Sequence, residues 1–247
     1  MLRKILSAAA SRLKGEPYEL DPAIPVSALL SVAGDRLLAM ARCLFRGLVI
    51  STDPRRLVML GKAVKIRNRR FITFGRGVTL GDHVFIDGLS SDGIHLGDGS
   101  SIGAYGVVKA TGVLNDIGKG LRLGQHSAFD AFAFFGASGG IEIGSNVIGG
   151  QRVSFHAESH HFDDLDMLIR DQGTHRKGIR IEDNCWIGSC VTFLDGAHLS
   201  SGCVVGAGSV VRGQFPPNAV LAGVPAKLIK YRGAEAAIPQ DPKKASR

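Results

Sequence analysis

Histidines and acidic residues are concentrated in one polar stretch of this 247-residue chain, between residues 154 and 177. His156, His160 and His161 lie close together there, and His175 follows near the end of the stretch. The pKa of an imidazole lies near neutrality, so a histidine can take the proton of a hydroxyl group and later return it. The stretch is therefore a candidate source of a general base, although a solvated surface role is favoured for His156 and His175.

A six-residue repeat of apolar residues surrounds this stretch and predicts the element that positions it. Every sixth residue is apolar at Ile181, Ile187, Phe193, Leu199, Val205 and Val211. A small or β-branched residue follows four positions after each of the first five, at Cys185, Val191, Ala197, Cys203 and Ser209. Helices and strands repeat about every 3.6 and every 2 residues, whereas a period of six is typical of a parallel β-helix. Three hexapeptides would close one triangular coil of about 18 residues, and the coils would stack.

The repeat begins near Lys62 and is interrupted before it resumes at Ile179. Residues 109–120 break its phase and predict a longer turn. Gly149 occupies a position at which a large apolar residue is expected, and the sequence offers no physical reason for it. From about Ser154 to Lys177 the repeat is absent, and an irregular insertion of that length predicts an extruded, functional loop.

The composition fits a turn-rich repeat protein of the reducing cytoplasm. The chain has 33 glycines, and aromatic residues make up only 6% of it. Its four cysteines show no zinc-finger spacing and do not predict a disulfide framework. Cys185 and Cys203 fall at inward positions of the repeat and are expected to be buried. The predicted location is therefore cytoplasmic.

Positive charge is confined to the N-terminal part of the chain. Residues 1–76 contain 15 Lys and Arg against 5 Asp and Glu, whereas residues 77–247 contain 15 against 17. Residues 1–15 have the pattern of a short basic amphipathic helix, and residues 26–50 form an apolar stretch with too many charges to span a bilayer. This segment could cap the open end of the β-helix, lie on the anionic inner surface of a membrane, or do both. No nucleic-acid-binding motif accompanies the charge, so nucleic acid is not an expected partner.

Several motifs in and after the polar stretch resemble those of the hexapeptide-repeat acyltransferases. They are SHHFDD, RKGIRIEDNCWIGS, VVGAGSVV and AGVPAKLIK. The galactoside and maltose acetyltransferases and the sugar O-acetyltransferases of surface-polysaccharide biosynthesis are the most similar members. The resemblance implies an all-β, left-handed parallel β-helix, a homotrimer, and acetyl-CoA bound in a cleft between neighbouring subunits. The expected organisation is a helical segment over residues 1–60, an acyltransferase domain over 61–230 with a loop at 154–178, and a flexible tail over 231–247.

The resemblance also implies roles for individual residues in acetyl transfer to a sugar hydroxyl. His160 matches the catalytic base of the family, with His161 as the alternative, and Glu158, Asp163 or Asp164 could orient its ring. Asp130 stands where relatives carry an asparagine near the acceptor, although a simple turn role is equally compatible with its position. The residues implied for coenzyme A are Trp186, Ser189, Gly206 and Ala207 along the pantetheine arm, and Arg212, Lys227 and Lys230 at the phosphates. Gly213 replaces a lysine that relatives use at that end.

Other activities on the same fold remain open at this point. A γ-type carbonic anhydrase holds zinc with three histidines from two subunits, and His126, His156 and His161 have roughly suitable spacing. The motifs favour the acyltransferase, for which no metal is expected. The sequence does not distinguish O-acetylation from N-acetylation of an amino sugar, exclude a non-catalytic scaffold, or identify the acceptor.

Overall fold

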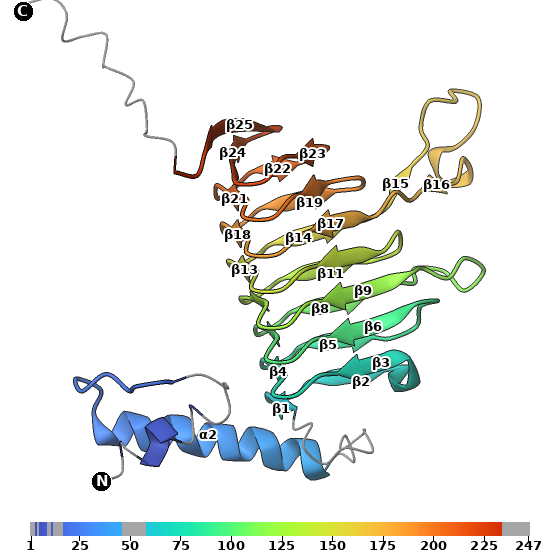
Figure 1. The fold of residues 1–247 in the computed structure, drawn as a ribbon. Helices are drawn as coiled ribbons and strands as arrows, with labels where there is room; N and C mark the ends of the chain where they lie inside the picture. Colours follow the sequence, from blue (N-terminus) through green and yellow to red (C-terminus); the bar gives the residue numbers. More distant parts are fainter. Residues whose placement is uncertain (1–2, 4, 9–10, 12–16, 46–57, 234–247) are drawn as a thin grey trace, which may run out of the picture.

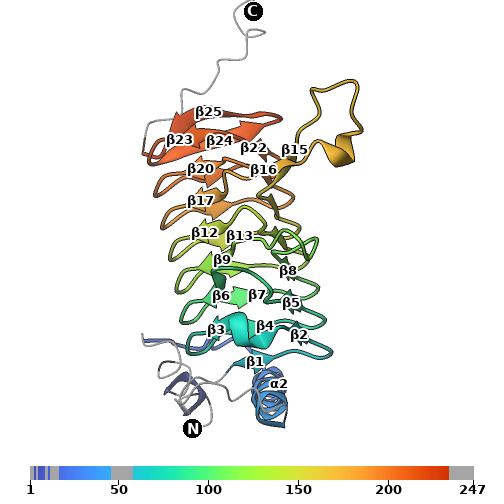
Figure 2. The same ribbon diagram turned by 90° about the vertical axis from the view of Figure 1, so that its right-hand side faces the viewer.

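Residues 59–231 form a left-handed parallel β-helix with three flat faces, as predicted (Figure 1). The computed structural model describes residues 3, 5–8, 11, 17–45 and 58–233. The helix α2 (Val26–Phe45) lies across the end of the β-helix, beneath its first coil (Figures 1 and 2). None of the described helices is long and apolar enough to cross a membrane.

Each face of the β-helix is one sheet, and successive strands of a coil belong to successive sheets. Sheet A contains β1 (Met59–Leu60), β4 (Thr79–Leu80), β7 (Ser101–Ile102), β10 (Ala128–Phe129), β13 (Ile148–Gly149), β18 (Trp186–Ile187), β21 (Val204–Val205), β24 (Ala219–Gly223) and β25 (Ala226–Tyr231). Sheet B contains β2 (Lys65–Arg67), β5 (Phe85–Asp87), β8 (Val107–Lys109), β11 (Phe134–Gly136), β14 (Ser154–His156), β19 (Thr192–Leu194) and β22 (Val210–Val211). Sheet C contains β3 (Ile72–Phe74), β6 (Gly93–Leu96), β9 (Gly120–Leu123), β12 (Ile141–Ile143), β17 (Ile179–Ile181), β20 (His198–Leu199) and β23 (Gln214–Phe215).

The predicted inward positions are confirmed as the core. All six apolar residues from Ile181 to Val211 are buried, and so are the five small residues that follow them, Cys185 and Cys203 included. The β-helix starts slightly earlier than the predicted Gly61, because Val58 and Leu60 already pack in its core. At the other end, β25 pairs antiparallel with β24 and extends the ordered fold to Tyr231. Most of the predicted helix 1–15, the segment 46–57 and the tail from residue 234 lie outside the described residues.

The predicted coil length of three hexapeptides holds from Ile181 to Val211, where Ile181 pairs with Leu199 and Phe193 with Val211, and it fails in earlier coils. Ile187 pairs with Val205, and the chain between them has the predicted length, but the coil that pairs Phe129 with Gly149 is slightly longer. The next coil, which pairs Gly149 with Ile187, is much longer because it contains the whole polar stretch. The longest insertions leave at the corner between sheets B and C, called the B/C corner below, where residues 110–119 and 157–178 project (Figure 1). The loop predicted to start at residue 154 therefore starts later, because Ser154–His156 pairs with both neighbouring strands of sheet B as β14.

The corner between sheets A and B, the A/B corner, is closed by a stack of rings. His83 stacks on Tyr105 with ring centroids 4.9 Å apart, and Tyr105 stacks on Phe132 at 5.1 Å. All three residues have a positive φ, which the tight corner requires. The three rings come from successive coils, so the stack braces the coils at this corner.

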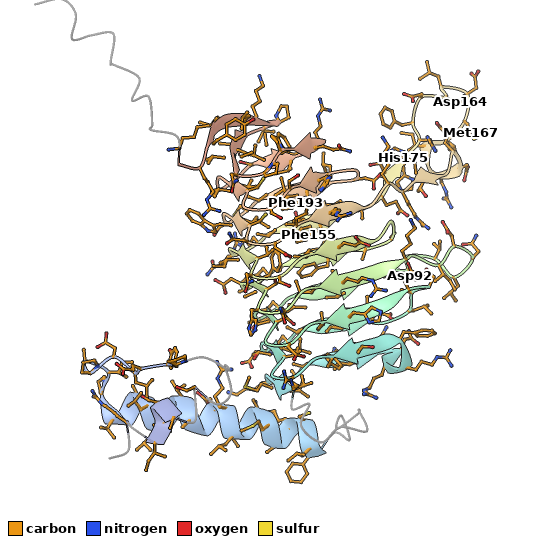
Figure 3. The ribbon with its side chains drawn as sticks, viewed as in Figure 1. Asp92, Phe155, Asp164, Met167, His175 and Phe193 are labelled. Carbon is orange, nitrogen blue, oxygen red and sulfur yellow. The ribbon has the colours of Figure 1, made fainter. Side chains whose placement is uncertain are left out.

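The glycine at position 149 is explained by an aromatic cluster inside the β-helix. Phe135, Phe155 and Phe193 stack face to face, with centroids 5.1 and 4.9 Å apart, and Phe129 meets Phe135 and Phe155 edge-on. Figure 3 shows Phe155 and Phe193 one above the other. A Cβ atom on Gly149 would lie 2.1 Å from Cδ1 of Phe129. The ring of Phe129 therefore fills the space that a large residue at position 149 would occupy.

We predict that Gly149→Ala lowers the free energy of unfolding by about 1–3 kcal/mol, because the added methyl group overpacks the core. Urea unfolding followed by circular dichroism measures this change. Gly112→Ala is the matched control, since a Cβ atom there meets nothing within 4 Å. Phe129→Leu should restore part of the stability in the double variant; equal stability of Gly149→Ala and wild type would contradict the assignment.

Candidate active site

The loop that carries the predicted base is a β-hairpin projecting from the B/C corner. Its strands β15 (Ser159–His160) and β16 (Thr174–His175) pair antiparallel, with Ser159 opposite His175 and His160 opposite Thr174. A 3₁₀ turn, η2 (Ile169–Asp171), lies in the tip. Figure 3 shows Asp164 and Met167 at the tip, away from the coils, and His175 near the base. The hairpin therefore holds both candidate bases outside the body of the β-helix.

A buried carboxylate anchors the C-terminal end of this hairpin. Both oxygens of Asp195 accept hydrogen bonds from the backbone N–H of Lys177 at 2.9 Å, and Oδ1 also accepts one from the N–H of Gly178 at 2.8 Å. The Asp195 side chain is only 1% exposed, and Nε2 of His175 lies 3.8 Å from its Oδ2. Asp195 thus fixes where the hairpin rejoins the coil. It was not among the predicted residues, because an aspartate at a turn of a repeat carries no distinguishing signal.

An ion-pair network joins the N-terminal side of the hairpin to the neighbouring loop 110–119. Arg176 Nε donates to Glu158 at 2.6 Å, and Arg176 Nη2 lies 2.8 Å from Asp116. Desolvation alone would lower the pKa of Arg176, but its hydrogen bonds and charge interactions with Glu158 and Asp116 outweigh it and raise that pKa. The network ties two insertions that leave different coils.

Two of the three carboxylates proposed to orient His160 are engaged elsewhere. Glu158 pairs with Arg176, and Asp164 accepts a hydrogen bond from the N–H of Asp166 within the tip. The backbone of Asp164 is held in turn by both groups of the Gln172 amide. Among the described residues no hydrogen bond orients the His160 ring, so this part of the prediction is not supported within one copy of the chain.

The two adjacent histidines lie on opposite sides of the hairpin, because side chains alternate along a strand. His161 is on the side of His175, and their ring centroids are 5.2 Å apart. His160 is on the side of Thr174, its partner in the register. The choice between the two histidines is therefore a choice between two different surfaces of the loop.

Most residues predicted to bind coenzyme A lie together on sheet A and the A/B corner. The carbonyl of Ser189 accepts a hydrogen bond from the N–H of Gly208 at 2.9 Å, which stacks Ser189 beside Gly206 and Ala207 of the next coil. Trp186 is 58% exposed on sheet A, in register with Val204. Val204 pairs with Val220, and Val220 pairs with Lys230 of β25. Lys227 pairs with Ala222 at the top of the A/B corner.

Two predicted residues stand apart from this group. Asp130 lies on the same A/B corner but in an earlier coil, exposed, with Oδ1 accepting the N–H of Ala131 at 2.7 Å. Arg212 follows β22 and is exposed at the B/C corner, on the edge of sheet B from which the hairpin projects. Sheet B therefore separates His160 and Arg212 from Asp130 and the sheet A group in a single copy.

Two hollows lie in the described part of the molecule, and neither is lined by a residue predicted to act as the base or to bind coenzyme A. One, of about 210 Å³, lies at the base of the hairpin and is lined by Lys109, Thr111, Phe134, His156 and Glu158, among others. His156, for which a surface role was favoured, thus lines a pocket next to the candidate base, with its ring centroid 5.4 Å from that of Phe134. The other, of about 470 Å³, lies over the outer face of sheet C.

The histidines considered for zinc are spread over the molecule. His126 lies at the turn between β9 and β10, on the corner between sheets C and A, whereas His156 lies on sheet B and His161 on the hairpin. Within the described part of the chain, no three His, Cys, Asp or Glu side chains are grouped so that they could hold a metal ion.

We predict that Asp195→Asn loosens the hairpin base, because an amide cannot accept the same three hydrogen bonds as a carboxylate. Loss of a charge-assisted hydrogen bond, worth about 1.5–3 kcal/mol, should speed exchange of the Lys177 and Gly178 amide hydrogens roughly ten- to hundredfold. Hydrogen–deuterium exchange measures this directly. Asp171→Asn, at an exposed carboxylate in the same loop, should leave both amides unchanged; identical exchange in the two variants would remove the anchoring role.

Comparison with known proteins agrees with this geometry. Residues 178–213 match the family model of the bacterial transferase hexapeptide, six repeats. A Mycobacterium tuberculosis protein named a probable acetyltransferase is 32% identical over 139 residues, which cover 56% of this chain and 42% of that protein. An Escherichia coli K12 protein named as a lipopolysaccharide biosynthesis O-acetyl transferase is 56% identical over 50 residues, 20% of this chain and 26% of that protein. The matched segments thus span between about a quarter and somewhat more than half of the relatives' lengths.

Two solved structures are among those to which the chain is similar. A hexapeptide-repeat-containing acetyltransferase from Vibrio cholerae is 31% identical, with a TM-score of 0.42, and the alignment covers 45% of this chain and 62% of that one. A maltose O-acetyltransferase from Clostridium difficile is 24% identical, with a TM-score of 0.48 and coverage of 66% and 71%. The expected resemblance is confirmed: residues 178–213 of the β-helix match bacterial transferase hexapeptide repeats, and the chain is similar to acetyltransferases.

Proposed function

We propose that the protein transfers an acetyl group from acetyl-CoA to a hydroxyl group of a sugar or glycan, with His160 as the general base. The observation that carries this proposal is the hairpin, which presents two adjacent histidines beside a β-helix of transferase hexapeptide repeats. Similarity to acetyltransferases, one of them named for lipopolysaccharide O-acetylation, supports both the donor and the acceptor class. Homologous structures described as complexed with acetyl-CoA or coenzyme A are in keeping with the donor.

The proposed chemistry is direct transfer between two bound substrates. His160 accepts the proton of the acceptor hydroxyl while its oxygen attacks the thioester carbonyl carbon. The tetrahedral intermediate collapses with cleavage of the carbon–sulfur bond, and the imidazolium returns the proton to the departing thiolate of coenzyme A. A backbone N–H or a polar side chain near the thioester would stabilise the oxyanion.

The sheet A group fits an extended coenzyme with anionic phosphates. Trp186 and Lys230 are separated by three strand spacings, or about 14 Å, on one exposed face. Lys227 and Lys230 are both exposed and form no ion pair within the described residues, so their ammonium groups are available to phosphate oxygens. Trp186 offers an apolar surface at the other end of the group, and the pantetheine arm would extend along sheet A from the lysines toward it.

A complete site requires a second copy of the chain. The hollow at the hairpin base, about 210 Å³, is smaller than the roughly 300–1,000 Å³ of typical ligand pockets. Sheet B also keeps His160 away from the sheet A group of its own chain. In a homotrimer the hairpin of one copy would approach the A/B corner of the next, and a cleft between them would hold both substrates.

We predict that His160→Ala lowers kcat by about 10²–10⁴ while acetyl-CoA binding is retained, because a general base acts mainly in the transition state. Release of the coenzyme A thiol across a panel of sugar acceptors measures kcat, and calorimetry measures binding. His161→Ala, on the opposite side of the hairpin, is the matched control. A large loss in His161→Ala alone would move the role to His161, and unchanged turnover in both would overturn the mechanism.

We also predict that two inactive variants complement each other when their subunits are mixed. His160→Ala removes the base at the B/C corner, and Ala207→Glu places a carboxylate at the exposed A/B corner. If the site lies between copies, co-expressed mixed trimers regain activity, because some interfaces combine two intact halves. Light scattering should give the mass of three chains. Absence of activity in mixed trimers would place the site within one chain.

A further inference from the structure

One face of α2 is apolar, exposed and turned away from the β-helix. Seven large apolar side chains of α2 are between 48% and 91% exposed. One of them, Val32, lies on the other side of the helix, and the remaining six are Val26, Leu30, Leu37, Leu38, Leu44 and Phe45. Successive residues of a helix are about 100° apart, so these six side chains fall within an arc of about 120°. Gly34 and Ala41 lie in the same arc, which contains no charged residue and only Ser27 as a polar one. An apolar stripe this wide normally faces a protein core.

The opposite face of α2 is already used to cap the β-helix. Leu29, Ala39 and Cys43 are buried, and Cys43 belongs to the same core as Leu60. Arg42 donates from Nη1 to the carbonyl of Leu60 at 3.0 Å, and Nη1 of Arg36 lies 3.2 Å from the sulfur of Met59. The predicted capping role is thus supported, but it accounts for only one side of the helix.

The exposed face is too small to hold two copies of the chain together alone. A 20-residue helix is about 30 Å long and about 10 Å wide, so its face offers roughly 300 Å². Pairing two such faces would bury roughly 600 Å², about half of what a stable interface needs. A fluid lipid surface can cover this apolar face without matching its shape, so it is a better binding partner for the face than a second copy of the chain.

Positive charge surrounds the same end of the molecule. Residues 58–81, which contain the first coil, have six Lys and Arg and no Asp or Glu. One of the six, Arg76, pairs with Asp98. Four others are exposed and have no ion-pair partner within the described residues: Lys62, Lys65, Arg67 and Arg70. These cations lie next to α2, roughly one helix diameter, about 10 Å, above its outer face, which is also about the screening length at 0.1 M salt.

We propose that α2 lies in the interface of an anionic membrane, with its apolar face among the upper acyl chains and the basic first coil against the headgroups. Apolar burial and attraction to anionic lipid are the two contributions that bind such helices. The axis of α2 runs across that of the β-helix (Figures 1 and 2). The β-helix would therefore stand upright on the membrane, with its later coils farthest from it.

This orientation narrows the acceptor, and that step rests on the proposed function. Strand β14, from which the hairpin leaves, is four strands above β2 in sheet B, or about 19 Å. With α2 beneath, His160 would stand about 30 Å from the lipid. A lipid-linked glycan of several sugars reaches that height, whereas a single lipid-linked sugar does not.

The test is flotation of the full chain with vesicles of phosphatidylcholine, with and without phosphatidylglycerol. We expect binding to the anionic vesicles only, weakening as salt is raised. Leu37→Glu should weaken it at least about tenfold, because it places a charge in the apolar arc. Ser31→Glu is the control matched in charge, on the same helix but outside the arc, and should change it less than about twofold.

Other outcomes would overturn the proposal. Equal binding to neutral and anionic vesicles, equal effects of the two substitutions, or no binding to either vesicle would each do so. A loss of oligomer mass in Leu37→Glu without vesicle binding would assign the face to contacts between copies. Thermal unfolding of each variant checks that the β-helix is intact. Coenzyme A release from a soluble acceptor should be the same in Leu37→Glu and wild type, which separates this proposal from the catalytic one.

Discussion

Hydrogen bonding between successive coils is the constraint on which the rest of this structure depends. A two-residue strand such as β18 is not stable alone, and it forms because it pairs with β13 below and β21 above. Register is maintained by the inward residues, since a shift of one residue would turn the core outward. The chain can therefore insert residues only at a corner, and only if the next strand returns to register. Gly149 pairs with Ile187 across the whole extruded hairpin for this reason.

The repeat in the sequence predicted the inward residues and the position of the hairpin. It did not predict the residues whose roles depend on contacts with a neighbouring coil. The six-residue spacing identified the inward residues from Ile181 to Val211, and its interruption located the hairpin within a few residues. Gly149 had no explanation, because the ring that needs the space belongs to Phe129, its register partner in the preceding coil. The sequence also did not predict that Asp195 and Arg176 hold the base of the hairpin. Their partners are a backbone segment and a neighbouring loop that only the stacked fold brings near them.

For the candidate site, too, the sequence suggested residue roles but not their positions in space. The resemblance implied roles for His160 and the coenzyme residues, and the fold then places these residues along the two edges of sheet B. A single prism is narrow enough to expose every corner, so it has no interior cleft for two substrates. In the proposed trimer the hairpin of one copy and the A/B corner of its neighbour would form the two walls of the site.

Capping and membrane binding make compatible demands on α2. The first coil needs apolar cover on one side only, which Leu29, Ala39 and Cys43 provide. If capping were the only role, the outer face would be expected to carry charges, as the exposed ends of repeat proteins do. Instead the two α2 arginines are directed toward Met59 and Leu60, and leucines occupy the solvent side. Leucines exposed to solvent favour aggregation, so we expect the outer face of α2 to be covered by a binding partner. The cations of the first coil indicate that this partner is an anionic surface.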